Sequence, residues 1–326
     1  MRAKSGVDVS MLVKVAVLVL AVGGIVGAAQ VSFPFIPEDR IPIKEITLTE
    51  TAYGALRKPP GQGPFPAVLF LHGGLGKNSM ANLRRNALRQ PAQSRFLAWG
   101  YVTVAATRRV IRHDPQDRGV IEDTLELVRA VRELPFVDAE SVALYGGSGG
   151  GTLALEVASV SDELAAIVAG EPATIIYMGM FTRDHIIFDD EGRPTGDRRW
   201  DVMNQDAKAL YTKEVREITR RKLSGLATPA LVLHGDQHAL KEFNFEVFVP
   251  EMEALGKPVA LKTYPGEPHG FYWGQGVDPA QALKANEDAD EFLRKHIHVL
   301  PRAVDASLTT PTGVQPMNPR AGNRGQ

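Results

Sequence analysis

The pattern of apolar and polar positions alternates between strand-like and helix-like spacing from Ile41 onward. Two short segments open the series, and most later runs are continuously apolar, as in strands buried on both faces of a sheet. The predicted strands are 43–49, 52–57, 67–71, 101–106, 142–144, 164–170, 229–234 and 259–264. A polar loop follows 67–71, and apolar residues at helical spacing predict helices ending near 99 and at 121–134, 152–160, 245–255 and 279–296.

This alternation predicts an α/β fold with a mostly parallel central sheet flanked by helices, opened by two antiparallel strands. One polar stretch of mixed composition, 172–226, interrupts the alternation directly after the sixth predicted strand. It is therefore predicted to be an insertion into the fold. Its aromatic residues suit either a substrate pocket or a small core of the insertion itself, and Trp273 is open to the same two interpretations.

The amino terminus differs from this central region. Basic residues precede an uncharged apolar run at 15–29, and Gly27 and Ala29 fit a signal-peptidase cleavage site before Gln30. The run is shorter than the roughly 20 residues that span a bilayer. Residues 1–29 are therefore predicted to be a secretory signal peptide, with an uncleaved signal anchor as the alternative, and the protein to be exported to the periplasm or the medium.

The carboxy terminus, 301–326, is rich in Pro, Gly, Thr and Asn and has almost no large apolar residue. Such a segment buries too little surface to offset the entropy of ordering it, so a flexible tail is expected. The remaining residues, 30–300, are long enough to form one α/β domain with a full core.

Net charge and composition indicate which kinds of binding partner to expect. The formal net charge is −1, which gives no reason to expect nucleic acid, and a membrane is expected only if 1–29 stays uncleaved. There are no cysteines, so an exported form cannot use disulfides. A local basic cluster is interpreted as a solvated loop, because arginine is mostly exposed: Arg108, Arg109, Arg112 and Arg118.

The strongest motif is Gly146-Gly147-Ser148-Gly149-Gly150, which fits G-x-S-x-G between a predicted strand and a predicted helix. A sharp turn there needs glycine on both flanks and lifts the serine hydroxyl above the sheet. The alternative is a glycine-rich loop with an incidental serine. The strand before Ser148 and the helix after it favour a nucleophile.

Three further strand ends carry candidate chemistry: His72-Gly73-Gly74-Leu75, the run from His234 to His238, and Tyr264 to Phe271. In parallel sheets, ligands bind where the strands end. With this H-G-G loop, the serine turn, the L-V-L-H-G strand and the Y-P-G-E-P-H-G-F segment in this order, the chain resembles the α/β-hydrolases. The resemblance spans 43–296 and is closest to dienelactone hydrolases and to esterases and peptidases of the prolyl oligopeptidase type.

The resemblance implies a Ser-acid-His triad that needs no cofactor. Ser148 is then the nucleophile and His269 its base. The backbone N–H of Gly149 and one from the Gly74–Leu75 stretch are then the oxyanion donors. The insertion 172–226 follows a strand end where this fold usually carries a lid or cap.

The acid departs from the family pattern, because its usual position holds His238. Asp236, two residues earlier, lies on the same side of an extended strand and is the preferred candidate. Glu171, at the end of the preceding core strand, is the alternative acid, and Glu242 is a third. His234, Asp236 and His238 also spell H-x-D-x-H, but the expected turn at Gly235 argues against a metal site.

The sequence thus predicts an exported serine hydrolase that cleaves a small carboxylic ester through an acyl-enzyme. A serine peptidase of the prolyl oligopeptidase type, acting on short peptides, is the first alternative. It is disfavoured because little sequence precedes the hydrolase region, where such enzymes usually carry a propeller. The second alternative is a non-catalytic binding protein on the same fold, suggested only by the irregular acid.

Overall fold

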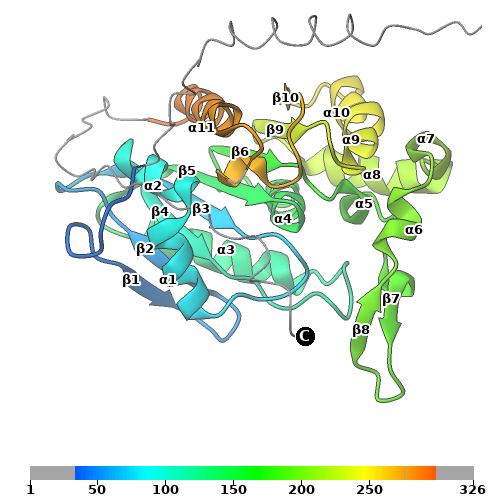
Figure 1. The fold of residues 1–326 in the computed structure, drawn as a ribbon, viewed down its shortest axis with the longest axis horizontal. Helices are drawn as coiled ribbons and strands as arrows, with labels where there is room; N and C mark the ends of the chain where they lie inside the picture. The colour runs from blue at the N-terminus through cyan, green and yellow to red at the C-terminus, as the bar shows by residue number, and fades with distance from the viewer. Residues whose placement is uncertain (1–33, 275, 299–326) are drawn as a thin grey trace, which may run out of the picture. The chain divides into compact units, whose positions relative to one another are not determined.

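An eight-stranded sheet forms the centre of the molecule, in the order β1-β2-β4-β3-β5-β6-β9-β10 (Figure 1). The computed structural model describes residues 34–274 and 276–298. Strand β2 pairs antiparallel with β1 and β4, and the other neighbours are parallel. The strands are β1 (Lys44–Thr47), β2 (Tyr53–Arg57), β3 (Phe65–Leu71), β4 (Val102–Ala106), β5 (Val137–Gly147), β6 (Ala166–Gly170), β9 (Ala230–Gly235) and β10 (Val259–Tyr264).

Helices cover both faces of this sheet because its central strands are apolar on both sides. In β3, Val68 and Phe70 pack towards one set of helices, whereas Leu69 and Leu71 pack towards the other. The first face carries α1 (Met80–Arg89), α2 (Pro91–Ala98) and α11 (Pro279–Arg294). The second carries α3 (Gly119–Arg132), α4 (Gly149–Ala158), α8 (Lys213–Gly225) and α10 (Val249–Ala254).

The α/β-hydrolase architecture expected from the sequence is confirmed, and two helices differ from their predictions. Helix α1 occupies part of the predicted polar loop: Ser79 caps it, and it buries only Leu83 and Ala87, too few for an apolar repeat to be visible. The helix predicted at 245–255 begins earlier, as α9 (Leu240–Phe243) and a π-helical turn, η3 (Asn244–Phe248), that lead into α10.

The segment between β6 and β9 contains several short elements and packs on the main core. Its elements are α5 (Thr174–Tyr177), η2 (Arg183–His185), β7 (Ile186–Phe188), β8 (Pro194–Asp197), α6 (Arg199–Met203), α7 (Ala207–Leu210) and α8. Tyr177 and Phe181 are buried in the same cluster as the sheet residues, so they belong to the main core. The β7–β8 hairpin projects away from the sheet (Figure 1). A role of this segment as a lid stays a prediction.

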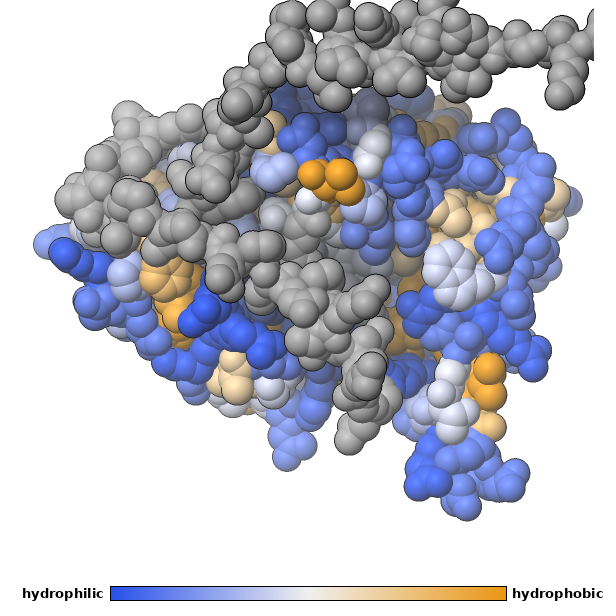
Figure 2. All heavy atoms as spheres, viewed as in Figure 1, coloured by the Kyte–Doolittle hydropathy of each residue, from blue (hydrophilic) through white to orange (hydrophobic). Residues whose placement is uncertain are grey.

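Hydrophilic side chains cover most of the described surface on the face shown in Figure 2, and apolar ones form small separate patches. Within 34–274 and 276–298, each helix is too short or too polar to cross a bilayer. The predicted signal (1–29) and tail (301–326) lie outside the described residues.

Candidate active site

Ser148 stands in a strained turn between β5 and α4. Its φ of 54° lies in the left-handed region, which non-glycine residues rarely adopt. A Cβ on Gly146 would lie 2.1 Å from the carbonyl oxygen of Gly150, and one on Gly150 would lie 2.2 Å from that of Leu71. Both flanks of the turn must therefore be glycine, as the motif predicts.

Two aromatic residues pack beneath this turn. A Cβ on Gly147 would lie 2.7 Å from the Tyr272 hydroxyl and 2.7 Å from the Trp273 ring. Tyr272 is buried, which raises the pKa of its hydroxyl well above the usual value. Trp273 stacks on Tyr145 with 5.1 Å between ring centroids. Trp273 therefore packs among the residues that support the turn.

The predicted oxyanion donors lie beside Ser148. Gly149 is the first residue of α4, where a backbone N–H has no intrahelical partner. The loop after β3 approaches the same point, since a Cβ on Gly149 would lie 2.6 Å from the Gly74 carbonyl oxygen. Gly74 has a φ of 80°, and Leu75 is buried behind it. The structure thus brings Gly149 and the Gly74–Leu75 stretch together.

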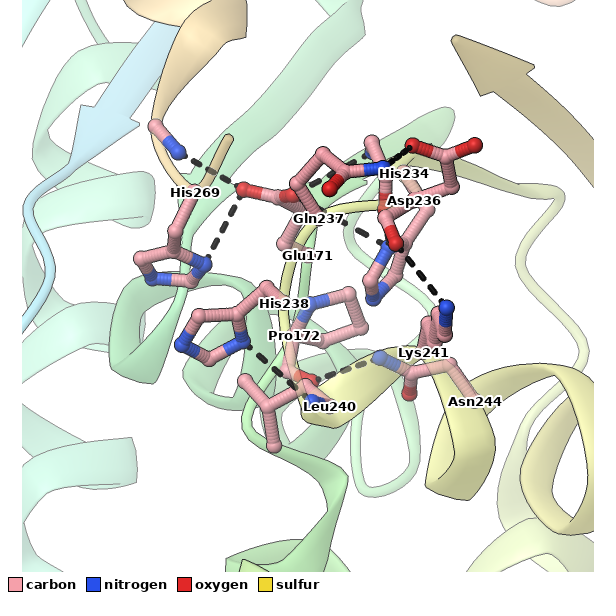
Figure 3. A network of polar contacts seen from close by, with 12 residues as sticks. Glu171, Pro172, His234, Asp236, Gln237, His238, Leu240, Lys241, Asn244 and His269 are labelled. Carbon is pink, nitrogen blue, oxygen red and sulfur yellow. Dashed lines mark hydrogen bonds and ion pairs between the residues drawn. The ribbon is translucent and has the colours of Figure 1, made fainter. Parts of the chain in front are cut away.

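Glu171 contacts His269. It directly follows β6, is completely buried, and its Oε2 lies 3.0 Å from His269 Nδ1 (Figure 3). The same oxygen accepts a hydrogen bond from the Gly270 N–H at 2.7 Å, and Oε1 accepts one from the Gly235 N–H at 3.2 Å. Three nitrogen atoms therefore surround this carboxylate, so both of its buried oxygens have polar partners.

Glu171 has a strained backbone conformation, and the loop that follows it is fixed by hydrogen bonds. Its φ is 42°, and among the described residues only Ser148 and Glu171 are non-glycine residues with positive φ. Asn244, buried in η3, donates to the Pro172 carbonyl at 3.0 Å and accepts from the Thr174 hydroxyl at 2.7 Å. The chain that leaves Glu171 is therefore fixed to the neighbouring helix.

Asp236, the preferred acid of the sequence analysis, does not contact His269. The chain turns after Gly235 instead of continuing extended, so the carboxylate of Asp236 points away from the imidazole (Figure 3). Its Oδ1 accepts from the Gly266 N–H at 2.8 Å and from the Gln237 side chain at 2.6 Å. The placement predicted for Asp236 is therefore wrong, and the alternative, Glu171, takes it. Glu242 is exposed on α9.

His238, at the usual position of the acid, stacks on His269 with 4.2 Å between ring centroids. Its Nδ1 accepts the Leu240 N–H at 3.2 Å, so that nitrogen is unprotonated. Burial, and next the nearby His269, lower the pKa of His238 to about 4; Glu171 opposes this shift and His234 adds to it. At neutral pH His238 is therefore an uncharged ring stacked on His269.

His269 is accessible to a substrate, with 30% of its side chain exposed. In the described part of the chain no hydrogen bond joins its ring to the Ser148 hydroxyl. Such bonds are often long until a substrate is bound. Trp200 of α6 is half exposed, 6.1 Å from the His238 ring between centroids, so one aromatic residue of the insertion does lie near the site.

The H-x-D-x-H residues do not form a common site. His234 is buried with its Nδ1 2.5 Å from the Gly235 carbonyl oxygen, whereas Asp236 points out of the strand end. Among the described residues, no group of three or more potential ligands is arranged to hold a metal ion.

The arginine cluster, expected to be solvated, is so only in part: Arg112 and Arg118 are exposed, whereas Arg108 and Arg109 are not. Arg109 pairs with Asp123 through two hydrogen bonds of 2.7 and 2.8 Å. Arg108 is 1% exposed and lies against Gly149. Only the position of Arg108, two residues after the end of β4, could have singled it out in the sequence.

Comparison with known proteins gives a matching family model and solved structures of similar fold. The model of the prolyl oligopeptidase family (Peptidase_S9) matches residues 108–299. The apo form of Thermogutta terrifontis esterase 2 is 21% identical with a TM-score of 0.52, and the match covers 82% of this chain and 97% of the esterase.

Two peptidases share the fold but are longer. A Mycobacterium tuberculosis puromycin-hydrolyzing peptidase is 17% identical with a TM-score of 0.57, over 81% of this chain and 40% of the peptidase. Pyrococcus horikoshii acylaminoacyl peptidase is 17% identical with a TM-score of 0.56, over 79% and 42%. At these identities the common property is the fold.

We predict that Glu171→Gln lowers turnover about ten-thousand-fold, roughly 5 kcal/mol, because the amide favours the wrong imidazole tautomer. Asp236→Asn is the matched control, since it also replaces a carboxylate by its amide at a strand end, and should lose tenfold or less. Turnover numbers are compared after thermal melts show both variants folded. A crippled Asp236→Asn beside a nearly normal Glu171→Gln would reverse the assignment.

A second prediction concerns pH. Between pH 6.5 and 4 the unfolded chain binds a proton at His238 that the folded chain does not, so the wild type loses stability as the pH falls through this window. His238→Asn, which keeps an acceptor for the Leu240 N–H, should lose less. His72 also has a pKa lowered to about 4, but it is common to both proteins. If melting temperature falls with pH equally in the wild type and in His238→Asn, the contribution assigned to His238 is refuted.

Proposed function

The chain belongs to the prolyl oligopeptidase family, and within this family of serine hydrolases we propose that it cleaves a small carboxylic ester. The observation that carries the proposal is the buried Glu171 carboxylate against His269, at the same sheet edge as the strained Ser148 turn. These residues are positioned by three different strand ends. Such an arrangement serves nucleophilic catalysis and has no evident use in a binding protein.

In the proposed mechanism, His269 Nε2 takes the proton of the Ser148 hydroxyl as Oγ attacks the ester carbonyl. Glu171 holds the Nδ1–H and stabilises the imidazolium that forms. The N–H groups at Gly149 and at Gly74–Leu75 stabilise the oxyanion. His269 then protonates the departing alcohol, and water, activated by the same imidazole, releases the acid from Ser148.

An ester substrate is supported by the Thermogutta enzyme of similar fold, which is an esterase. Short peptides remain the second candidate substrate because the family includes peptidases. A panel of p-nitrophenyl esters and proline-containing peptides separates the two.

We predict that Ser148→Ala abolishes labelling by a fluorophosphonate probe and lowers turnover about a million-fold. The melting temperature should be nearly unchanged, because the hydroxyl lies on a turn and contributes nothing to the core. Ser224→Ala, at an exposed position in α8, is the control and should be labelled normally. Retention of a tenth of the activity by Ser148→Ala would place the nucleophile elsewhere. An unlabelled wild type would favour a binding protein.

We also propose export, from the apolar run 15–29 and the site before Gln30. Expression with the complete amino terminus should give a mature form that begins at Gln30 by mass spectrometry. A full-length chain in the membrane fraction would instead identify 1–29 as an anchor.

A further inference from the structure

A cavity of about 260 Å³ lies next to the oxyanion donor Gly149. It lies among the loop after β4, helices α3 and α4, and the start of the 172–226 insertion. Its apolar walls include Ile111, Val120 and Ile176, and Arg108 lines it where it meets Gly149. Pockets for drug-sized ligands span about 300–1,000 Å³, so this cavity, just below that range, has room for a small acyl or alkyl chain that carries a polar end group.

Arg108 is a buried cation whose hydrogen-bonding groups are mostly unused. Its side chain is 1% exposed, and Nη1 makes one long bond of 3.4 Å to the Gly149 carbonyl. Among the described residues, Nε and Nη2 have no hydrogen-bond partner. Burial lowers the pKa of Arg108 to about 10, so the group is still charged at neutral pH. A buried charge of this kind is expensive unless something pairs with it.

The other charges around the cavity are already compensated or exposed. Lys222 pairs with Glu156 at 2.6 Å. Asp117 accepts the Gly119 N–H at 2.9 Å, and Arg118 is exposed. In the described part of the chain no carboxylate forms an ion pair with Arg108, which leaves its positive charge available to a ligand.

We propose that Arg108 binds a carboxylate carried by the substrate, so that the enzyme acts on esters with a negative charge a few carbons from the ester bond. The planar guanidinium presents its N–H groups as a fork that matches a carboxylate. The apolar walls suit the short carbon chain between the two groups. This inference rests on the proposed esterase function and specifies its substrate class.

Matched substrate pairs test the proposal in wild-type enzyme. Mono-p-nitrophenyl glutarate and p-nitrophenyl pentanoate differ by a carboxylate in place of a methyl group in the acyl part. The pair 4-acetoxybenzoate and its methyl ester places the charge in the leaving group. We expect kcat/KM to be at least about tenfold higher for the charged member of one pair, with spontaneous hydrolysis subtracted. No preference in either pair would overturn the proposal.

Variants assign the preference to Arg108. Arg108→Met should lower kcat/KM for the charged member of the preferred pair at least about tenfold more than for the neutral member. Arg108→Lys keeps the charge without the fork, should fold, and should lose part of the preference. Arg112→Gln removes an exposed charge from the same loop and should leave the preference intact. Equal losses on charged and neutral substrates in the Arg108 variants would mean that Arg108 only braces the Ser148 turn, which contradicts the proposal.

A glutarate-binding experiment tests the carboxylate site independently of the proposed esterase function. By calorimetry, glutarate should bind Ser148→Ala, which cannot turn over, and should not bind the double variant with Arg108→Met. Equal binding to both, or none to either, would overturn the carboxylate site. Failure of the esterase proposal would appear instead as a wild type that the fluorophosphonate does not label, whatever the glutarate result.

Discussion

The buried carboxylate of Glu171 is the interaction on which the candidate site depends. It accepts hydrogen bonds from the backbone of Gly235 and Gly270 and lies 3.0 Å from His269 Nδ1. Gly235 ends β9, and His269 and Gly270 follow β10, so the side chain of Glu171 joins the carboxyl ends of three parallel strands. An unpaired carboxylate at this depth would be costly, and the three donors offset that cost. Displacement of any one loop would leave the charge partly unsatisfied.

Backbone strain is concentrated at the same place. Ser148 and Glu171, with φ of 54° and 42°, each occupy a conformation that costs about 1–3 kcal/mol. The two are joined through β6, since the Ser148 N–H donates to the Gly170 carbonyl at 2.8 Å. The Glu171 N–H in turn donates to Leu233 of β9 at 2.8 Å. Packing of the sheet beneath keeps both residues in backbone conformations that an unfolded chain would rarely adopt.

The fold and the nucleophile turn could be predicted because each depends on local pattern, whereas His269 was identified through the family resemblance of its segment. Apolar runs define the strands, and the glycines around Ser148 are required by close backbone contacts at 146 and 150. The acid could not be predicted in this way. Whether Asp236 or Glu171 reaches His269 depends on how the chain turns after Gly235, and apolar periodicity carries no information about that turn.

Arg108 was missed for a related reason. Composition treats an arginine cluster as solvated, but burial is decided by the elements that surround a residue. The loop after β4 places Arg108 between Gly149 and the insertion, and neither neighbour is close in sequence. Helix α1 escaped prediction because a surface helix with two buried residues carries little apolar signal.

Proton NMR tests the central assignment of Glu171 most directly. A His269 Nδ1–H held by a buried carboxylate should give a far-downfield resonance, strengthened when a phosphonate adduct on Ser148 charges the imidazole. The structure predicts that this resonance is present in the wild type and in Asp236→Asn and absent in Glu171→Gln. A resonance that survives Glu171→Gln and disappears in Asp236→Asn would show that His269 is held by a different carboxylate.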